Sequence, residues 1–403
     1  MIKSKLTKAI ITIVICGFFQ IPDSYACSMF KITMHGKTMV GNNEDYWNPN
    51  SRIWFEKGQK NEFGAFYVGF NNFWPQGAMN QAGLVFDGFA EDYKAISDTI
   101  GKKPLGMNFL KEIMRRCATV DEVKNYFSQF NLSGLETSMY FFVDKSGRYL
   151  VVEGDSLIIG NKEHYIVSNF YPSQIKNECD IPLSYYQKGR QYLENNKDIS
   201  VAFCSSVLDT MHQERAWGAG TMYSTIYDLD EGVINLYFFR DYTHVVKFNL
   251  NEEVAKDNHS LIIPELFPEN TKGHDFMRNY NAIGNELDLL KNEDILNDSL
   301  RYKFVTNTLF TKDLSLIRTF SNKVNEIGSS WMEKGNYNAA IGVYMIQVKL
   351  SPESWNAYED LAEAYMRNNQ NDLALINYEK SLKLNRDNKE VEKQIERLMK
   401  LKK

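Results

Sequence analysis

The sequence predicts an α+β domain followed by an all-α tail. Up to about residue 250, apolar segments separated by turn residues are typical of paired strands. The stretches 105–130 and 180–212 have the apolar spacing of amphipathic helices, which would cover the faces of the sheets. From about residue 323 a helical pattern repeats, with Ile327 and Leu361 at matching places 34 residues apart.

The composition is that of a globular protein with a sizeable core. The chain has 403 residues, of which 43% are hydrophobic and 13% aromatic, and this length allows two or three domains. The formal net charge of −5 is small for a chain of this size. We therefore expect neither nucleic acid nor an anionic membrane surface as a partner.

Residues 1–26 are expected to form a signal peptide that is removed. They contain three early lysines, an apolar run over 9–19, and a polar stretch that ends in the small-x-small pattern of Ser24 and Ala26. That run is too short to cross a bilayer stably, and no later segment approaches the roughly 18 apolar residues of a membrane span. The mature protein is therefore expected to be secreted or periplasmic.

Cleavage after Ala26 would make Cys27 the first residue of the mature chain. The other cysteines of that chain fit inert roles. Cys117 and Cys204 lie in apolar helical patterns that predict buried thiols, and Cys179 lies in a polar loop where it either pairs or stays free. So few cysteines in an exported chain of this length do not form a disulfide framework.

An N-terminal cysteine combines a thiol and a free α-amine in one residue. An α-amine titrates at about pH 7.7–8.0, so at neutral pH it accepts the thiol proton and later returns it to a leaving amine. Cys27 is therefore the predicted nucleophile, and the 6 scattered histidines are not needed as a base. Two alternatives stay open: a cysteine without function, and lipidation, although Ser24 stands where a lipidation signal has a leucine-like residue.

The residues after Cys27 read as a strand, a tight turn at His35 and Gly36, and a returning strand. A hairpin of this length brings Asn43 and Asp45 back beside the new N-terminus. Asp45 is then placed to hold the α-ammonium and to stabilise its charge. Without a cleaved N-terminus, Asp45 would be an ordinary turn residue.

Several motifs follow one another in a fixed order. They are 41–45 (GNNED), 79–84 (MNQAGL), a hairpin over 138–155 that is followed by Asn169, and a late hairpin over 221–239. Together they resemble the choloylglycine hydrolase and penicillin V acylase family of N-terminal-nucleophile hydrolases. The resemblance implies an αββα sandwich in which Cys27 is the nucleophile, Asp45 orients the N-terminus and Asn169 donates to the oxyanion. It also places Asn42 and Asn43 among the substrate-binding residues.

The chain departs from the family pattern at three places. Asn42 replaces the motif arginine, so a fixed positive charge near the thiol is missing. The second oxyanion donor of the family falls near Ala90, with Asp87 close by but of the wrong charge. A later arginine falls near Tyr185, and Arg190 and Arg215 are alternatives for it. These departures argue against a bile-salt hydrolase and leave a general acyl-amide hydrolase.

The predicted domains are the signal peptide 1–26, a hydrolase domain over 27–255, a helical linker over 256–320, and a repeat region over 321–403. No strand is expected after about residue 250. The 34-residue period resembles tetratricopeptide repeats, with 388–403 as a capping helix. Such repeats commonly bind peptides or proteins, and here they serve either as a partner site or as a stabilising appendage.

The resulting hypothesis is an exported hydrolase that cleaves the C–N bond of a linear, small-molecule N-acyl amide through an acyl-enzyme on Cys27. No metal and no organic cofactor is expected, because the chain lacks metal-binding, phosphate-binding and serine-elbow motifs. The alternative is a catalytically inactive hydrolase fold that serves as a binding or scaffold protein through its repeats.

Overall fold

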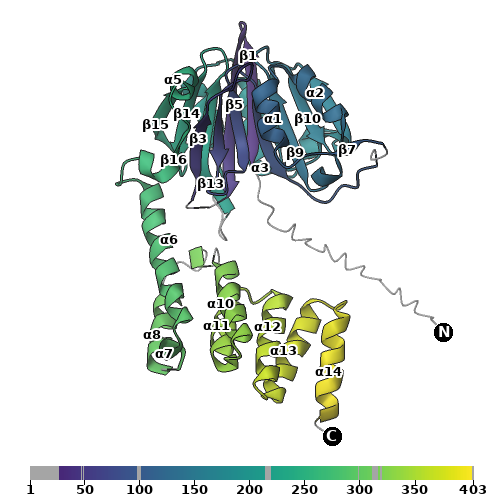
Figure 1. Cartoon of the computed structure of the whole chain (residues 1–403), viewed down its shortest axis with the longest axis vertical. Helices are drawn as coiled ribbons and strands as arrows, with labels where there is room; N and C mark the ends of the chain where they lie inside the picture. Colours follow the sequence, from purple (N-terminus) through teal and green to yellow (C-terminus); the bar gives the residue numbers. More distant parts are fainter. Residues whose placement is uncertain are drawn as a thin grey trace, which may run out of the picture.

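The computed structural model describes residues 27–46, 48, 50–97, 101–213, 219–297, 299–310, 316–317 and 320–401. The predicted signal peptide lies outside the described residues. Two sheets with flanking helices form one part of the molecule, and a series of helices forms the other (Figure 1). In the described part of the chain, no helix has the length and apolar character needed to cross a membrane.

The first sheet has six antiparallel strands in the order β12-β1-β2-β13-β14-β15. At its centre, β1 and β2 form the predicted hairpin, with the turn at His35 and Gly36, both in the left-handed region. The strands are β1 (Ser28–Met34), β2 (Lys37–Tyr46), β12 (His164–Ser168), β13 (Ala219–Asp228), β14 (Val233–Phe238) and β15 (Asp241–Asn249).

The second sheet has eight antiparallel strands in the order β11-β10-β9-β6-β5-β4-β3-β16. They are β3 (Arg52–Glu56), β4 (Ala65–Gly69), β5 (Pro75–Asn80), β6 (Val85–Ala90), β9 (Ser138–Val143), β10 (Tyr149–Glu153), β11 (Ser156–Gly160) and β16 (His259–Ile262). Two further short strands, β7 (Lys103–Pro104) and β8 (Phe130–Asn131), pair in parallel.

Side-chain alternation along the strands sorts the buried residues into three layers. Met29, Val40 and Val85 belong to the core between the sheets. Phe86 packs with the helices α1 (Phe109–Arg116) and α2 (Val120–Ser128) on the outer face of the eight-stranded sheet. Phe30 packs with α3 (Ser184–Asn195) and α4 (Val201–Met211) on the outer face of the six-stranded sheet. The predicted mixed α/β architecture is therefore confirmed.

The expectation that strands end near residue 250 is wrong. After α5 (Leu250–Val254), β16 pairs with β3 at the edge of the eight-stranded sheet, with Leu261 opposite Ile53. The sheets therefore extend past the predicted domain boundary at 255. Four residues between polar neighbours are too short to show a strand period, and the partner strand lies about 200 residues earlier in the sequence.

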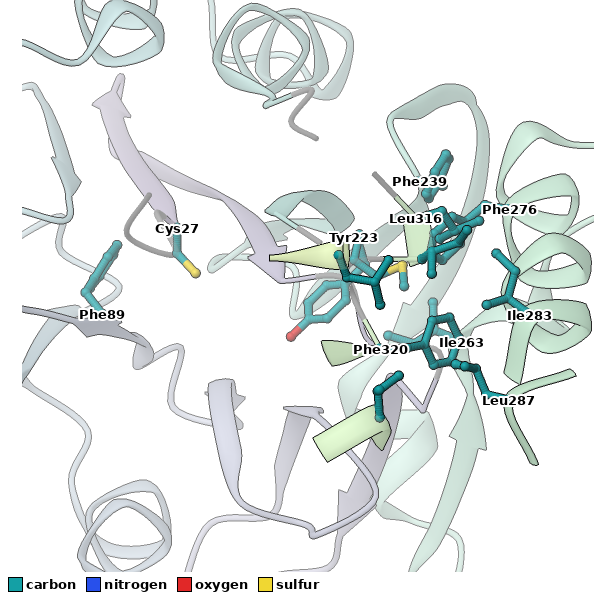
Figure 2. Close-up of a cluster of buried hydrophobic side chains, with 14 of the residues drawn as sticks. Cys27, Phe89, Tyr223, Phe239, Ile263, Phe276, Ile283, Leu287, Leu316 and Phe320 are labelled. Carbon is teal, nitrogen blue, oxygen red and sulfur yellow. The ribbon is translucent and has the colours of Figure 1, made fainter. Parts of the chain in front are cut away.

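The core between the sheets continues into the helical part of the molecule. Phe239 stacks on Phe276 of α6 (Lys272–Asp288) with ring centroids 4.8 Å apart, and the ring centroids of Tyr280 and Phe320 are 4.3 Å apart. Figure 2 shows Phe239, Phe276 and Phe320 in one cluster with Ile283 and Leu287 of α6. One apolar cluster therefore joins the sheets to the helical part through α6.

In the helical part, consecutive helices pack against each other in pairs that stack along the chain (Figure 1). Gly328 lies under the ring of Tyr344, and Ala340 and Ala374 are fully buried at places 34 residues apart, so small residues occupy the helix crossings. The helices are α6 (Lys272–Asp288), α7 (Glu293–Asn297), α8 (Ser299–Phe310), α10 (Ser321–Glu333), α11 (Tyr337–Leu350), α12 (Trp355–Arg367), α13 (Asn371–Leu384) and α14 (Lys389–Leu401).

Candidate active site

Cys27 lies immediately before β1, with its side chain 7% exposed between the two sheets. Its backbone carbonyl accepts a hydrogen bond of 2.8 Å from the Ser168 hydroxyl, which lies 2.7 Å from the Tyr185 hydroxyl of α3. In Figure 2 the Cys27 sulfur and the Tyr223 hydroxyl point into the same space, with Phe89 beside Cys27. The thiol is therefore held at a fixed place in the inner layer.

The residues of the GNNED motif alternate between the two faces of β2. Val40 belongs to the core between the sheets and Met39 to the core beneath α3 and α4. Asn42 and Glu44 consequently face the inner layer with Cys27, whereas Asn43 and Asp45 face the helices.

Two buried carboxyl groups lie near the Cys27 thiol. Burial raises the pKa of Glu44 to about 7, although the Cys27 thiol and the Tyr223 hydroxyl lie close enough to favour its ionised form. Asp87 extends from the inner face of β6 and accepts a hydrogen bond of 2.8 Å from the N–H of Gly88. Burial, and then the charge of Glu44, hold the pKa of Asp87 well above its ordinary value.

The same surroundings disfavour the thiolate while Cys27 is joined to residue 26. Burial raises the pKa of the Cys27 thiol well above its ordinary value, and the charges of Glu44, Asp87 and Asp45 raise it further. A hydrogen bond from the backbone N–H of Asp45 acts in the opposite direction. The thiol therefore needs an additional positive charge nearby to ionise at neutral pH.

The structure corrects the expected substrate-binding role of Asn43. Its side chain is fully buried on the helix-facing side of β2, where its amide donates to the carbonyl of Leu208 at 3.0 Å. Its oxygen accepts from the hydroxyls of Ser224 at 2.6 Å and Tyr242 at 3.2 Å. Asn43 thus joins α4 to the sheet, and its side chain points away from the layer that contains the Cys27 thiol.

Asp45 also faces the helices, but it lies at the end of β2 beside Cys27. Its carboxylate accepts hydrogen bonds from the Gln213 amide and the Thr221 hydroxyl, and the Thr221 hydroxyl also accepts from the backbone N–H of Gln213 at 2.9 Å. These donors hold the carboxylate in place. Its negative charge raises the pKa of the Cys27 thiol. Its contact with a free α-amine stays a prediction.

Asn169 directly follows β12, whose Ser168 pairs with Ser28 of β1. Cys27 and Asn169 therefore lie at the same end of neighbouring strands. The side-chain amide of Asn169 donates to the carbonyl of Ala90, which leaves its second N–H without a fixed acceptor. Ala90, near which the family's second oxyanion donor is expected, thus supplies an acceptor that orients Asn169.

The expected arginine is replaced by other contacts. Tyr185 bonds to Ser168, and Arg190 pairs with Glu194 of its own helix. Arg215 lies outside the described residues. The charged groups that shift the pKa of Cys27 are the carboxylates named above.

Four contributors to this site were missed in the sequence: Glu44, Tyr223, Ser168 and, as a member of the inner layer, Asp87. The two-residue period of β2 would have placed Glu44 on the face of Asn42. Ser168 and Tyr223 carry no such signal, because strand register alone brings them near Cys27.

A separate hollow of about 610 Å³ lies where α6 and α10 approach Tyr46, the residue after Asp45. Tyr280, Phe320 and Trp331 give it aromatic walls, and Lys323 and Glu326 lie at its edge. Within the described residues, no group of three or more histidine, cysteine or acidic side chains has an arrangement that could hold a metal ion.

Comparisons with known proteins give matches among solved structures. Two variant forms of the conjugated bile acid hydrolase of Clostridium perfringens are 16% identical, with a TM-score of 0.47. They cover 59% of this chain, and 97% and 96% of their own chains. The penicillin V acylase of Agrobacterium tumefaciens is 13% identical with a TM-score of 0.46, over 59% of this chain and 91% of its own. No protein-family model and no curated protein matches.

Proposed function

We propose that this chain is an exported amide hydrolase whose nucleophile is the thiol of Cys27. The observation that carries the proposal is the position of that thiol. It lies at the start of a central strand between two sheets, with Asn169 at the end of one neighbouring strand and Asp45 at the end of the other. The substrate class is a linear N-acyl amide, and no cofactor takes part.

The reaction begins when cleavage after Ala26 frees the α-amine of Cys27. The amine takes the thiol proton, and the thiolate attacks the carbonyl carbon of the amide. The oxyanion that develops at the carbonyl oxygen accepts a hydrogen bond from the second side-chain N–H of Asn169. The C–N bond then breaks as the α-ammonium protonates the leaving amine. Water attacks the resulting thioester, releases the carboxylic acid and restores the thiol.

Maturation also supplies the missing positive charge. While Cys27 is joined to Ala26, the three neighbouring carboxyl groups hold its pKa high. A free α-ammonium on the same residue offsets part of that charge and lowers the pKa of the thiol. The uncleaved chain is therefore latent, and removal of residues 1–26 starts activity in the secreted or periplasmic protein.

The helical tail is proposed to contain tetratricopeptide repeats that bind a protein or peptide. The burial of Ala340 and Ala374 at equivalent places and the close packing of Gly328 on Tyr344 support this proposal. In the alternative function, the hydrolase fold is inactive and the tail alone does the work. The acidic surroundings of Cys27 favour that alternative, because carboxylates oppose thiolate formation.

One experiment separates the two functions. The secreted protein is analysed by mass spectrometry at its N-terminus and incubated with a panel of N-acyl amines and N-acyl amino acids. We expect a mature chain that begins at Cys27 and releases the free acid, and no release by the Cys27→Ser variant. An acylated N-terminus, another first residue, or equal activity of wild type and variant would contradict the enzyme proposal.

A further inference from the structure

Several buried oxygen atoms in the inner layer have no hydrogen-bond partner. Three of them are acceptors, Oδ1 of Asn42, Oε2 of Glu44 and Oδ2 of Asp87, in residues no more than 3% exposed, and the others include the hydroxyls of Tyr223 and Tyr227. Two of the three acceptors come from β2 and the third from β6, so both sheets contribute to the group. Buried acceptors of this kind are costly unless a donor reaches them, which indicates an occupant that brings N–H or O–H groups.

The two carboxyl groups also interact unfavourably with each other. The charge of Glu44 raises the pKa of Asp87, and burial raises the pKa of both carboxyl groups. Cys27 and Tyr223 lie beside Glu44, the Asn42 side chain hydrogen-bonds to Asp87, and Asp45 and Tyr227 are also close, but none of these groups is a cation. A bound cation would stabilise both ionised carboxylates at once.

The α-ammonium of the mature chain does not balance this charge. It adds one positive charge beside Asp45, Glu44 and Asp87, which carry three negative charges when ionised. The register of β1 and β2 places Glu44 opposite residue 27, and Asp45 is the next residue along β2. One α-ammonium therefore leaves two of the three ionised carboxylates without a counter-charge.

We propose that the substrate of this site carries an ammonium group that binds between Glu44 and Asp87. The inference rests on the proposed function of Cys27 as the nucleophile. An ammonium offers three N–H donors, which matches the three unpartnered acceptors. An anionic group would instead meet two carboxyl groups.

Strand order sets the direction of the bound substrate. The six-stranded sheet runs β12-β1-β2-β13, so Asn169 lies on one side of Cys27 and Glu44 on the other. The scissile carbonyl oxygen therefore faces Asn169, while the ammonium end extends over β2 toward Tyr223 of β13. The proposed substrate therefore has a linear spacer between the amide and the ammonium.

The turnover test uses amides that share one acyl group. Monoacylated butane-1,4-diamine, N-acyl pentylamine and N-acyl 4-aminobutyrate have chains of similar length and differ in the end charge, and a second set places the ammonium on the acyl side. In at least one set we expect kcat/KM to be about tenfold higher for the cation than for the neutral amide, and lower again for the anion. Equal or reversed rates in both sets would overturn the inference.

Two variants test the assigned carboxyl groups. Glu44→Gln and Asp87→Asn should each reduce the cation-to-neutral ratio of kcat/KM to about threefold or less. Glu91→Gln is the matched control, because Glu91 is also a carboxyl with an unpartnered buried oxygen but does not shift the pKa of Cys27. An unchanged ratio in both test variants would contradict the assignment.

A binding measurement keeps this inference separate from the proposed function. Butane-1,4-diamine, butylamine and butyrate are titrated calorimetrically into the mature Cys27→Ala protein in two buffers of different ionisation enthalpy. We expect the diamine to bind most tightly, with release of protons near pH 7, and Glu44→Gln to reduce that release. Diamine binding without any amide turnover would reject the hydrolase and keep the charge assignment. Turnover without charge preference would keep the hydrolase and reject the charge assignment. Absence of binding by either amine would also overturn the assignment.

Discussion

On the face of β2 that contacts α4, the Asn43 amide and the Asp45 carboxylate both bond to named partners on neighbouring elements. On the opposite face, one residue away in each case, Asn42 and Glu44 keep oxygen atoms without a donor although they are equally buried. Satisfied buried polar groups stabilise a fold, whereas unsatisfied ones are costly, and we proposed above that a ligand supplies their missing donors. One strand thus separates a structural face from a chemical face.

The largest effect is expected on the chemical face, at the nucleophile. Cys27→Ala should lower kcat by about 10³-fold or more, because no other group can form the acyl-enzyme. The measurement is release of the free acid from an N-acyl amide by the correctly processed variant. Cys204→Ala is the control, since Cys204 is a buried thiol beneath α4 and should leave kcat within about twofold.

The next effect concerns the oxyanion. Asn169→Ala should lower kcat by about 10²- to 10³-fold with little change in KM, because the N–H acts only when negative charge develops. Asn169→Asp keeps the size of the side chain and removes the donor, so it should be as slow as alanine. Full activity of the aspartate variant would show that Asn169 supplies no donor.

A substitution on the structural face should act on stability and leave the chemistry intact. Asn43→Ala removes the acceptor for Ser224 and the donor for Leu208, so the free energy of unfolding should fall by about 2–3 kcal/mol. Chemical denaturation measures this loss. If kcat of the folded variant also fell more than about tenfold, Asn43 would belong to the chemical face after all.

The smallest effect sharpens the comparison through pH. In the uncleaved chain the pKa of Glu44 is raised to about 7, so the folded state keeps a proton that the unfolded state releases near pH 4–5. The unfolding free energy therefore falls as the pH rises through this window. Glu44→Gln should remove this loss and stabilise the uncleaved chain by about 2 kcal/mol at pH 8, with no gain below pH 4. Equal stabilisation at both pH values would contradict the pKa shift as its cause.

Local sequence patterns indicate the chain segments of the site better than the directions of their side chains. The hairpin, the position of Asn169 and the buried states of Cys117 and Cys204 could be expected from local patterns. The direction of Asn43 could not be taken from the motif resemblance, because a one-residue step reverses the face of a strand. Tyr223 and β16 depend on pairing between segments far apart in the sequence, which local periodicity does not contain.

The hydrogen bond from the Ser168 hydroxyl to the carbonyl of Cys27 has a consequence for the proposed cleavage after Ala26. Chain ends normally fray, and a reactive group on a loose end would sample many positions. Here β1 pairs with β12 on one side and with β2 on the other, so the proposed cleavage after Ala26 would leave the Cys27 sulfur in place. If that cleavage occurs, the proposed nucleophile is already held rigidly when it becomes the chain terminus.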